Sequence, residues 1–275
     1  MNPIFVTRFE TLRKPGYGAA FGWLCAALLV AFANAALARA DDDPLATERK
    51  AIDEHRFEDA KTALAAYVSE HADSSEAVFM LGKAESCLGN YQVAEEKIKA
   101  AIALDDSVGE YYAELGSVMI ARAQTLDMFE AGPIYMGAVE QFRKSVAVDP
   151  DNLHGHIALC RYYWNAPEVG GGSIVRAKEE AAEVERLNPY LGKVEYALIA
   201  KKEGRTDDAV ARFEELVAMD EKNVWAQVEL GKLYRAQGKL PEAKAMIEKA
   251  LALDPENADA EAALSALATT QASAP

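Results

Sequence analysis

Apolar residues recur along this chain every three or four positions, and the pattern returns with a period close to 34 residues. Residues 224–257 and 75–108 align without a gap, with glycines, alanines and apolar residues at matching places, and residues 190–223 form a third copy. Within each copy the apolar stripe is helical, as in Ala243, Ile247 and Ala250. The pattern predicts a series of amphipathic helices built from one repeated unit.

A small alanine marks the same place in every copy. It is separated from the next by 34, 44, 39, 32 and 34 residues, which indicates a 34-residue unit with two expansions and one contraction. The alanines are Ala60, Ala94, Ala138, Ala177, Ala209 and Ala243. The first copy is degenerate, because Thr47-Glu48 stands where Leu-Gly is expected.

The residue types within a copy predict two antiparallel helices. Gly231 in the first helix and Ala243 in the second are small enough for close approach, and Gly238 suits the turn between them. Pro241 fits the start of the second helix, and Asp254-Pro255 ends it. Such a hairpin cannot bury its own apolar face, so neighbouring hairpins must stack.

These residues resemble the tetratricopeptide-repeat (TPR) family over residues 41–257. The resemblance implies an all-α fold, an α-solenoid of about six helix hairpins followed by a C-terminal capping helix. The expected units are residues 41–74, 75–108, 109–152, 153–189, 190–223 and 224–257, with the cap at 258–268 and a loose tail at 269–275.

Two units carry insertions, of ten residues in the third and five in the fourth, which we place at the turns between paired helices. The two turns should be neighbours on one edge of the solenoid, where their apolar residues either pack on each other or form a recognition ridge. The second insertion contains Tyr162, Ala166-Pro167 and a run of glycines. This stretch resembles a mostly uncharacterised group of bacterial exported TPR proteins, some of which have been linked to TonB-type uptake.

The first forty residues differ from the rest. A basic start is followed by a charge-free segment, whose centre at residues 19–33 is almost entirely apolar, and by Ala38-Arg39-Ala40. This order is typical of an export signal removed after Ala40. The alternative is an uncleaved membrane anchor, since the segment is long enough to span a bilayer, although three glycines and Asn34 make it a poor membrane helix.

The charge restricts the class of partner. The net charge is −15, and removal of a signal carrying three net positive charges would leave about −18. Such a chain would be repelled by nucleic-acid phosphates and by anionic lipid. We therefore expect no nucleic-acid partner, and membrane contact only if the N-terminal segment is uncleaved.

No catalytic, cofactor or metal site is predicted. Gly170-Gly171-Gly172-Ser173 lacks the lysine of a phosphate-binding loop, so we interpret it as a turn with Ser173 as N-cap. His154 and His156 would lie on nearly opposite faces of one helix. Cys87 and Cys160 fall two units apart, beyond disulfide reach.

The TPR resemblance places ligands in the concave groove lined by first helices. At the corresponding positions the last three units carry five basic residues and two tryptophans. In two of these units an acid, Glu195 or Glu229, directly follows one of the positions. The candidate groove residues are Arg161, Trp164, Lys201, Lys202, Trp225, Lys232 and Arg235. We expect them to form a basic strip beside the tryptophans.

The sequence therefore predicts a periplasmic or secreted scaffold, not an enzyme, that binds a protein or peptide with acidic character. The alternative is a membrane-tethered envelope assembly factor or an accessory protein of a TonB-type uptake system. The oligomeric state is left open by these patterns.

The export signal yields a direct prediction. Protein isolated from the cell envelope should begin at Asp41, because the small-residue exit Ala38-Arg39-Ala40 is the cleavage pattern. N-terminal sequencing decides the matter, and a chain that still starts near Met1 would indicate the uncleaved anchor.

Overall fold

The computed structural model describes residues 43–272. The predicted signal at residues 1–40 and the last three residues of the predicted tail lie outside the described residues. The described residues from Glu48 onward belong to one compact unit.

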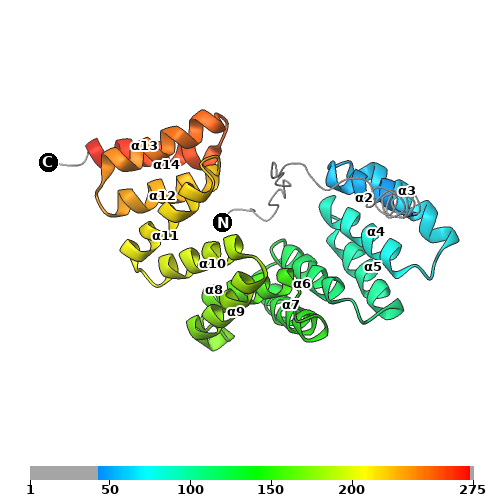
Figure 1. Ribbon diagram of the computed structural model, residues 1–275. Coiled ribbons are helices and arrows are strands. Elements are labelled where there is room, and N and C mark those ends of the chain that lie inside the picture. Colours follow the sequence, from blue (N-terminus) through cyan, green and yellow to red (C-terminus); the bar gives the residue numbers. More distant parts are fainter. Residues whose placement is uncertain (1–42, 273–275) are drawn as a thin grey trace, which may run out of the picture. The chain divides into compact units, whose positions relative to one another are not determined.

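The described chain is all-α, as predicted, with thirteen α-helices, one short 3-10 turn and no strand between residues 43 and 272 (Figure 1). Six helix pairs follow one another, and a last helix completes the array. The helices are α2 (Ala46–Asp53), α3 (Phe57–Glu70), α4 (Ser75–Cys87), α5 (Tyr91–Leu104), α6 (Gly109–Ala123), α7 (Met128–Val148), α8 (Leu153–Asn165), α9 (Ile174–Leu187), α10 (Pro189–Lys202), α11 (Thr206–Met219), α12 (Val224–Ala236), α13 (Leu240–Leu253) and α14 (Ala258–Ala272).

Local chemistry fixes where the helices begin and end. The side chains of Ser74, Asn152 and Asn223 accept hydrogen bonds from backbone N–H groups three residues later, so each caps the first helix of its unit. Between paired helices, Gly204 and Gly238 adopt positive φ angles of 71° and 75°, which side-chain-bearing residues rarely adopt.

Within a pair, a small residue of the first helix faces a side chain of the second. A Cβ added at Gly82 would stand 2.7 Å from Ile98 Cγ1, and one at Gly231 would stand 2.7 Å from Ile247 Cγ1. At Gly116 it would stand 2.5 Å from the Phe142 ring. The absent side chains are therefore what lets the two helices approach.

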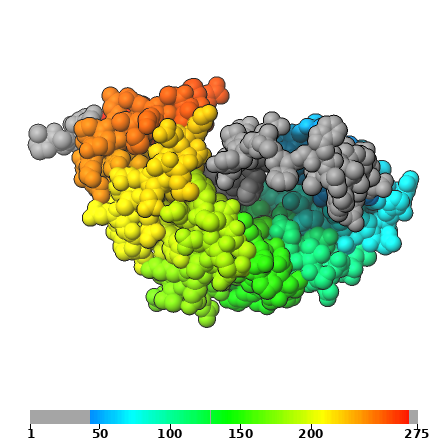
Figure 2. Space-filling model, in the orientation of Figure 1, coloured from blue at the N-terminus to red at the C-terminus, as the bar shows by residue number. Residues whose placement is uncertain are grey.

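From α5 onward, each second helix packs against its own partner and also against the first helix of the next unit, and α3 packs against α4. The buried residues Ala209, Phe213 and Leu216 of α11, for example, lie in one cluster with Val194 of α10 and Leu230 of α12. Successive units lie in chain order in the space-filling view, from the cyan of α4 and α5 to the orange of α13 (Figure 2).

The two insertions differ from each other, which corrects the prediction that both lie in turns. The first mainly lengthens helices: α6 and α7 have 15 and 21 residues, against 13 and 14 in α4 and α5. The second remains a turn at residues 166–173, with a 3-10 segment at Glu168–Gly170.

The C-terminal boundary also differs from the prediction. The capping helix α14 continues to Ala272, so residues 269–272 are helical where a loose tail was expected. Among the helices of residues 43–272, none combines the length and apolar character needed to cross a bilayer.

Candidate functional site

The first helices α4, α6, α8, α10, α12 and α14 carry the predicted site. Consecutive first helices contact each other for α4 with α6, α6 with α8, α8 with α10, and α12 with α14. We call the residues at positions 2, 5, 6, 9, 12 and 13 of these helices the first-helix face, counting from Ser75, Gly109, Leu153, Tyr190, Val224 and Ala258. All seven predicted residues belong to it, on α8, α10 and α12.

Arg161 is held by a neighbouring unit. Its Nε and Nη2 lie 2.8 Å and 2.7 Å from Oε1 of Glu195 on α10. The Glu195 side chain is 0% exposed, so this ion pair compensates a carboxylate that has lost its water. Arg161 is therefore committed to the contact between units.

Lys201 and Lys232 converge on a second buried acid. Lys201 on α10 pairs with Glu229 on α12, and the Lys232 Nζ lies 3.0 Å from Glu229 Oε1 and 2.6 Å from Asp259 Oδ2 on α14. Burial opposes the charge on Lys232, but the hydrogen bond to Asp259 and the charge of Glu229 leave its pKa raised. Lys232 thus stays protonated between two carboxylates.

The same connection recurs at the N-terminal end. Position 9 of one first helix contacts position 2 of the next in two further places. Arg49 of α2, counted from Asp41, lies 3.0 Å from Glu76, and Ser117 lies 2.9 Å from His154. We call this series of contacts, together with those of Arg161, Lys201 and Lys232, the inter-unit polar ladder. In α10 position 9 is Leu198, which has no polar group in its side chain, and Lys201 one turn later makes the contact to the next unit by pairing with Glu229.

The polar ladder corrects the picture of a continuous basic strip. Three of the five predicted basic residues are neutralised by Glu195, Glu229 and Asp259. Lys202 and Arg235 make no hydrogen bond or ion pair through their side chains with any residue of the described range. Lys202 is exposed and Arg235 is half-buried, so these two carry the uncompensated positive charge among the predicted residues.

The two tryptophans are part of the packing rather than free anchors. Trp225 is half-buried, and its ring lies 5.5 Å from that of Phe213, centroid to centroid. Trp164 is also half-buried and packs against the cluster formed by α7, α8 and α9. Each therefore offers only part of its ring to a partner.

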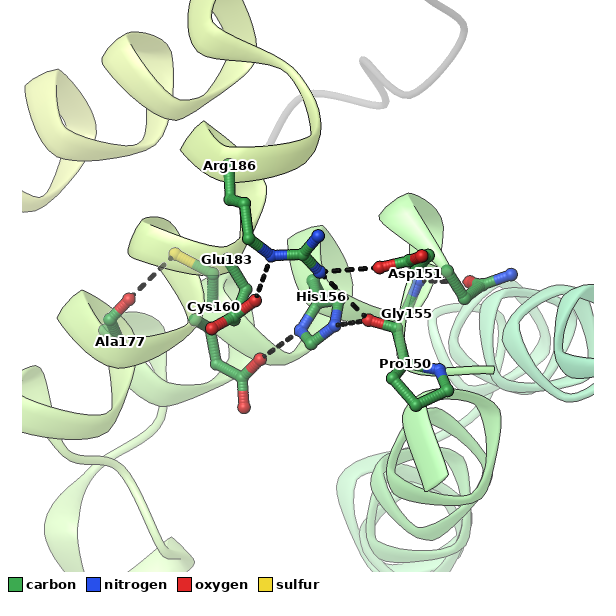
Figure 3. A network of polar contacts seen from close by, with 10 residues as sticks. Pro150, Asp151, Gly155, His156, Cys160, Ala177, Glu183 and Arg186 are labelled. Atoms are coloured by element: carbon green, nitrogen blue, oxygen red, sulfur yellow. Dashed lines mark hydrogen bonds and ion pairs between the residues drawn. The ribbon is translucent and has the colours of Figure 1, made fainter. Parts of the chain in front are cut away.

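His156 has a structural role that its position in the sequence did not reveal. Its Nδ1 lies 2.7 Å from Glu180 Oε2 and its Nε2 lies 3.0 Å from the Pro150 carbonyl oxygen. Figure 3 shows the ring reaching the Pro150 carbonyl, with Arg186 spanning Glu183 and Asp151 beside it. Because a carbonyl only accepts, Nε2 donates, and the carboxylate favours a second proton on Nδ1.

The repeat supplies a comparison for His156. Gln227 stands at the same place in unit six and donates from Nε2 to the Glu221 carbonyl oxygen at 2.6 Å. The shared element is thus a buried donor that fastens the start of the first helix to the preceding connection. His156 adds a charge to that contact.

The residues of the second insertion are held in one conformation. The Tyr162 hydroxyl donates to the Gly170 carbonyl, and the Ser173 N–H donates to the Tyr163 carbonyl at 2.7 Å. Gly171 has a φ of 89°, and a side chain at Gly172 would collide with the Ala166 carbonyl. Ser173 caps α9, as predicted, by accepting from the Arg176 N–H.

Both insertions display apolar side chains. Val169 is 98% exposed, Phe129 is 94% exposed, and Met136 is also exposed. The interpretation in which the insertions bury their apolar residues against each other does not hold for these three. We call them the insertion ridge residues.

Cys87 and Cys160 are both free thiols, and burial raises the pKa of Cys160, whose sulfur contacts the Ala177 carbonyl oxygen. One group in the described range brings three potential metal ligands together, namely Glu110, Glu114 and His154. Sequence reasoning missed it because the carboxylates come from a different unit than the histidine.

The environment of His156 predicts a pH-dependent contribution to stability. The hydrogen bond to Glu180 raises the pKa of His156 above its ordinary value of 6.5, despite burial. A raised pKa stabilises the folded state fully below about pH 6.5, and this contribution disappears as the pH rises through the folded-state pKa. His156→Gln keeps a donor for Pro150, as Gln227 does for Glu221, but removes the titration.

Urea unfolding measured between about pH 5.5 and 8.5 tests this prediction. The difference in unfolding free energy between wild type and His156→Gln should shrink as the pH rises. The exposed His71→Gln is the control and should show no such narrowing. A constant difference for His156→Gln would contradict protonation of this ring in the fold.

Comparison with known proteins agrees with the helix pairs. Two tetratricopeptide-repeat family models match, one at residues 49–108 and the other at residues 200–267. No curated protein matches the sequence significantly.

Solved structures share the fold at low sequence identity. A tetratricopeptide repeat protein from Parabacteroides merdae is 15% identical, with a TM-score of 0.63 over 83% of this chain and 85% of its own. PilF of Pseudomonas aeruginosa is 17% identical, with a TM-score of 0.56 over 72% and 84% of the two chains.

The Cut9–Hcn1 hetero-tetramer of the APC/C contains a chain with a TM-score of 0.65 and 13% identity. The match covers 87% of this protein but only 45% of that chain, so this protein spans less than half of its length. These likenesses establish the architecture alone. The family models show tetratricopeptide repeats at residues 49–108 and 200–267, a kind of repeat that generally mediates protein–protein interaction, and the helix pairs and the solved structures show that the described chain is an all-helical solenoid of the same architecture.

Proposed function

We propose that this protein is an exported, non-catalytic scaffold that binds a peptide segment of a partner protein on its first-helix face. The observation that carries the proposal is the pairing pattern of that face. In the last three helix pairs most charges of that face are used between units, whereas Lys202 and Arg235 are left uncompensated in a chain of net charge −15.

Electrostatics define the class of segment. Two free cations on the mostly neutralised C-terminal part of this face attract acidic side chains or a C-terminal carboxylate, while the acidic remainder of the protein repels them. The part of Trp225 that stays accessible lies on the same helix as Arg235 and supplies apolar contact. An acidic peptide with an apolar residue fits these features.

The place of action is proposed from the sequence. The basic start, the apolar segment and the Ala38-Arg39-Ala40 exit support export to the periplasm or beyond. A membrane-tethered assembly factor, or an accessory protein of a TonB-type uptake system, is the alternative. It would use residues 1–40 as an anchor and bind its partner in the same way.

The insertion ridge is a second surface that could bind a partner. Val169 and Phe129 are almost fully exposed, and Val169 stands on a loop held by the Tyr162 hydroxyl and by two glycines. A rigid exposed apolar side chain is inexpensive to bury in a complex, since little conformational entropy remains to be lost. The insertion ridge is therefore the alternative docking site.

The charge pattern predicts the effect of reversing the two free cations. Once a partner has been identified by crosslinking in envelope extracts, Lys202→Glu/Arg235→Glu should weaken its binding about tenfold or more. Affinity should also fall as salt is added. Neither substitution breaks an ion pair, so the thermal stability of the variant should stay near that of wild type.

A matched control changes the charge equally on another surface. Lys144 on α7 and Lys249 on α13 are exposed, unpaired within the described residues and carried by second helices. Lys144→Glu/Lys249→Glu should bind as wild type does. If both double variants bind equally well and Phe129→Ser/Val169→Ser does not, the insertion ridge is the binding site.

A further inference from the structure

The junction between α6 and α8 brings together three side chains that commonly ligate metals. Glu110 and Glu114 are four residues apart on α6, so they share one face of that helix. His154 projects from the first turn of α8 in the next unit. One potential ligand atom from each residue lies within 4.8 Å of the other two.

We propose that Glu110, Glu114 and His154 form a binding site for a divalent transition-metal ion of the Zn²⁺ type. One imidazole and two carboxylates are a ligand set suited to such ions, and three protein ligands leave a fourth position for water or for a partner's side chain. The presence of the imidazole favours this class over Ca²⁺ or Mg²⁺, which prefer oxygen ligands alone.

The spacing of two of the ligands already suits a metal. His154 Nδ1 lies 3.2 Å from Glu110 Oε1. Two ligands of a tetrahedral site with bonds of about 2.0–2.1 Å stand roughly 3.3 Å apart. Glu114 needs only a side-chain adjustment to bring its carboxylate to the same centre.

Neighbouring side chains form hydrogen bonds to two of these ligands, as the groups that orient metal ligands do in known metal sites. The Ser117 hydroxyl lies 2.9 Å from His154 Nε2, and the Asn152 amide donates to Glu110 Oε2 at 3.2 Å. Without an ion, a proton on Nδ1 joins the ring to the Glu110 carboxylate. An ion bound here would take the place of that proton, while Nε2–H donates to the Ser117 hydroxyl.

Glu114 supplies an independent argument for a cation at this junction. Glu195 and Glu229 occupy the same position 6 in later first helices, and both are ion-paired. Glu114 is half-buried, yet its carboxylate makes no hydrogen bond or ion pair with any described residue. A bound cation would give Glu114 the kind of partner that Glu195 and Glu229 already have.

One nearby charge opposes the ion. The positive charge of Lys83 on α4 acts on both glutamates, but its Nζ is placed 5.6 Å from the centre of the Phe79 ring rather than in an ion pair. Lys83→Met should therefore tighten metal binding. A bound ion would also join units three and four, because its ligands come from both.

Titration with ZnCl₂ in metal-free buffer, followed by calorimetry, tests the site on the full chain. We expect one saturable equivalent, an increase in melting temperature, and a visible absorption band when Co²⁺ replaces Zn²⁺. Glu114→Gln and His154→Gln should each abolish the saturable equivalent. Ser117→Ala, which removes the group on Nε2, should weaken binding about tenfold.

Two control variants separate this site from the general acidity of the surface. Glu130→Gln changes an exposed carboxylate, and His71→Gln changes an exposed imidazole. Both variants should still bind one saturable equivalent of Zn²⁺. Circular dichroism of every variant checks that the helices are formed. Absence of saturable binding to wild type, or binding retained in folded Glu114→Gln and His154→Gln, would overturn the proposal. The proposal would also be overturned if Zn²⁺ left the NMR titration of the His154 ring unchanged. In that case only a proton would lie between His154 and the glutamates.

Discussion

The second, third and sixth units of this protein depend on the close approach of their two helices. Gly82 faces Ile98, Gly116 faces Phe142 and Gly231 faces Ile247, and in each pair the second residue fills the space that the glycine leaves. The opposing side chain lies four residues after the marker alanine, so one small residue in each helix sets the distance between them. Each hairpin presents an apolar surface to the unit before it and another to the unit after it, and stacking of the units buries both surfaces.

The polar ladder follows from the same stacking. Because first helices are placed side by side in a constant register, position 9 of one reaches position 2 or 6 of the next. Pairing at these points offsets the cost of burying Glu195 and Glu229. On the C-terminal part of the first-helix face it leaves few charges free, so that Lys202 and Arg235 dominate the attraction of a partner there.

The hairpins could be predicted from the sequence because their determinants are local. Gly238, Pro241 and Ala243 specify a turn, a helix start and a close contact within a few residues. The pairing of charges could not be predicted, since Arg161 and Glu195, or Glu110 and His154, are brought together only by stacking. The length of α7 was missed for a related reason: ten extra residues fit a turn or a longer helix equally well until Asp127 is seen to cap Phe129 and Glu130.

The most direct test of this account is the effect of a single methyl group at two glycines of one hairpin. Gly116→Ala places a Cβ against the Phe142 ring, whereas Gly137→Ala on α7 meets only the mobile end of Met119. In urea unfolding, Gly116→Ala should lose about 1–3 kcal/mol. Gly137→Ala should gain up to about 1 kcal/mol, because alanine is the better helix former. If both variants were equally stable, close approach at the glycine would not be the constraint that builds the unit.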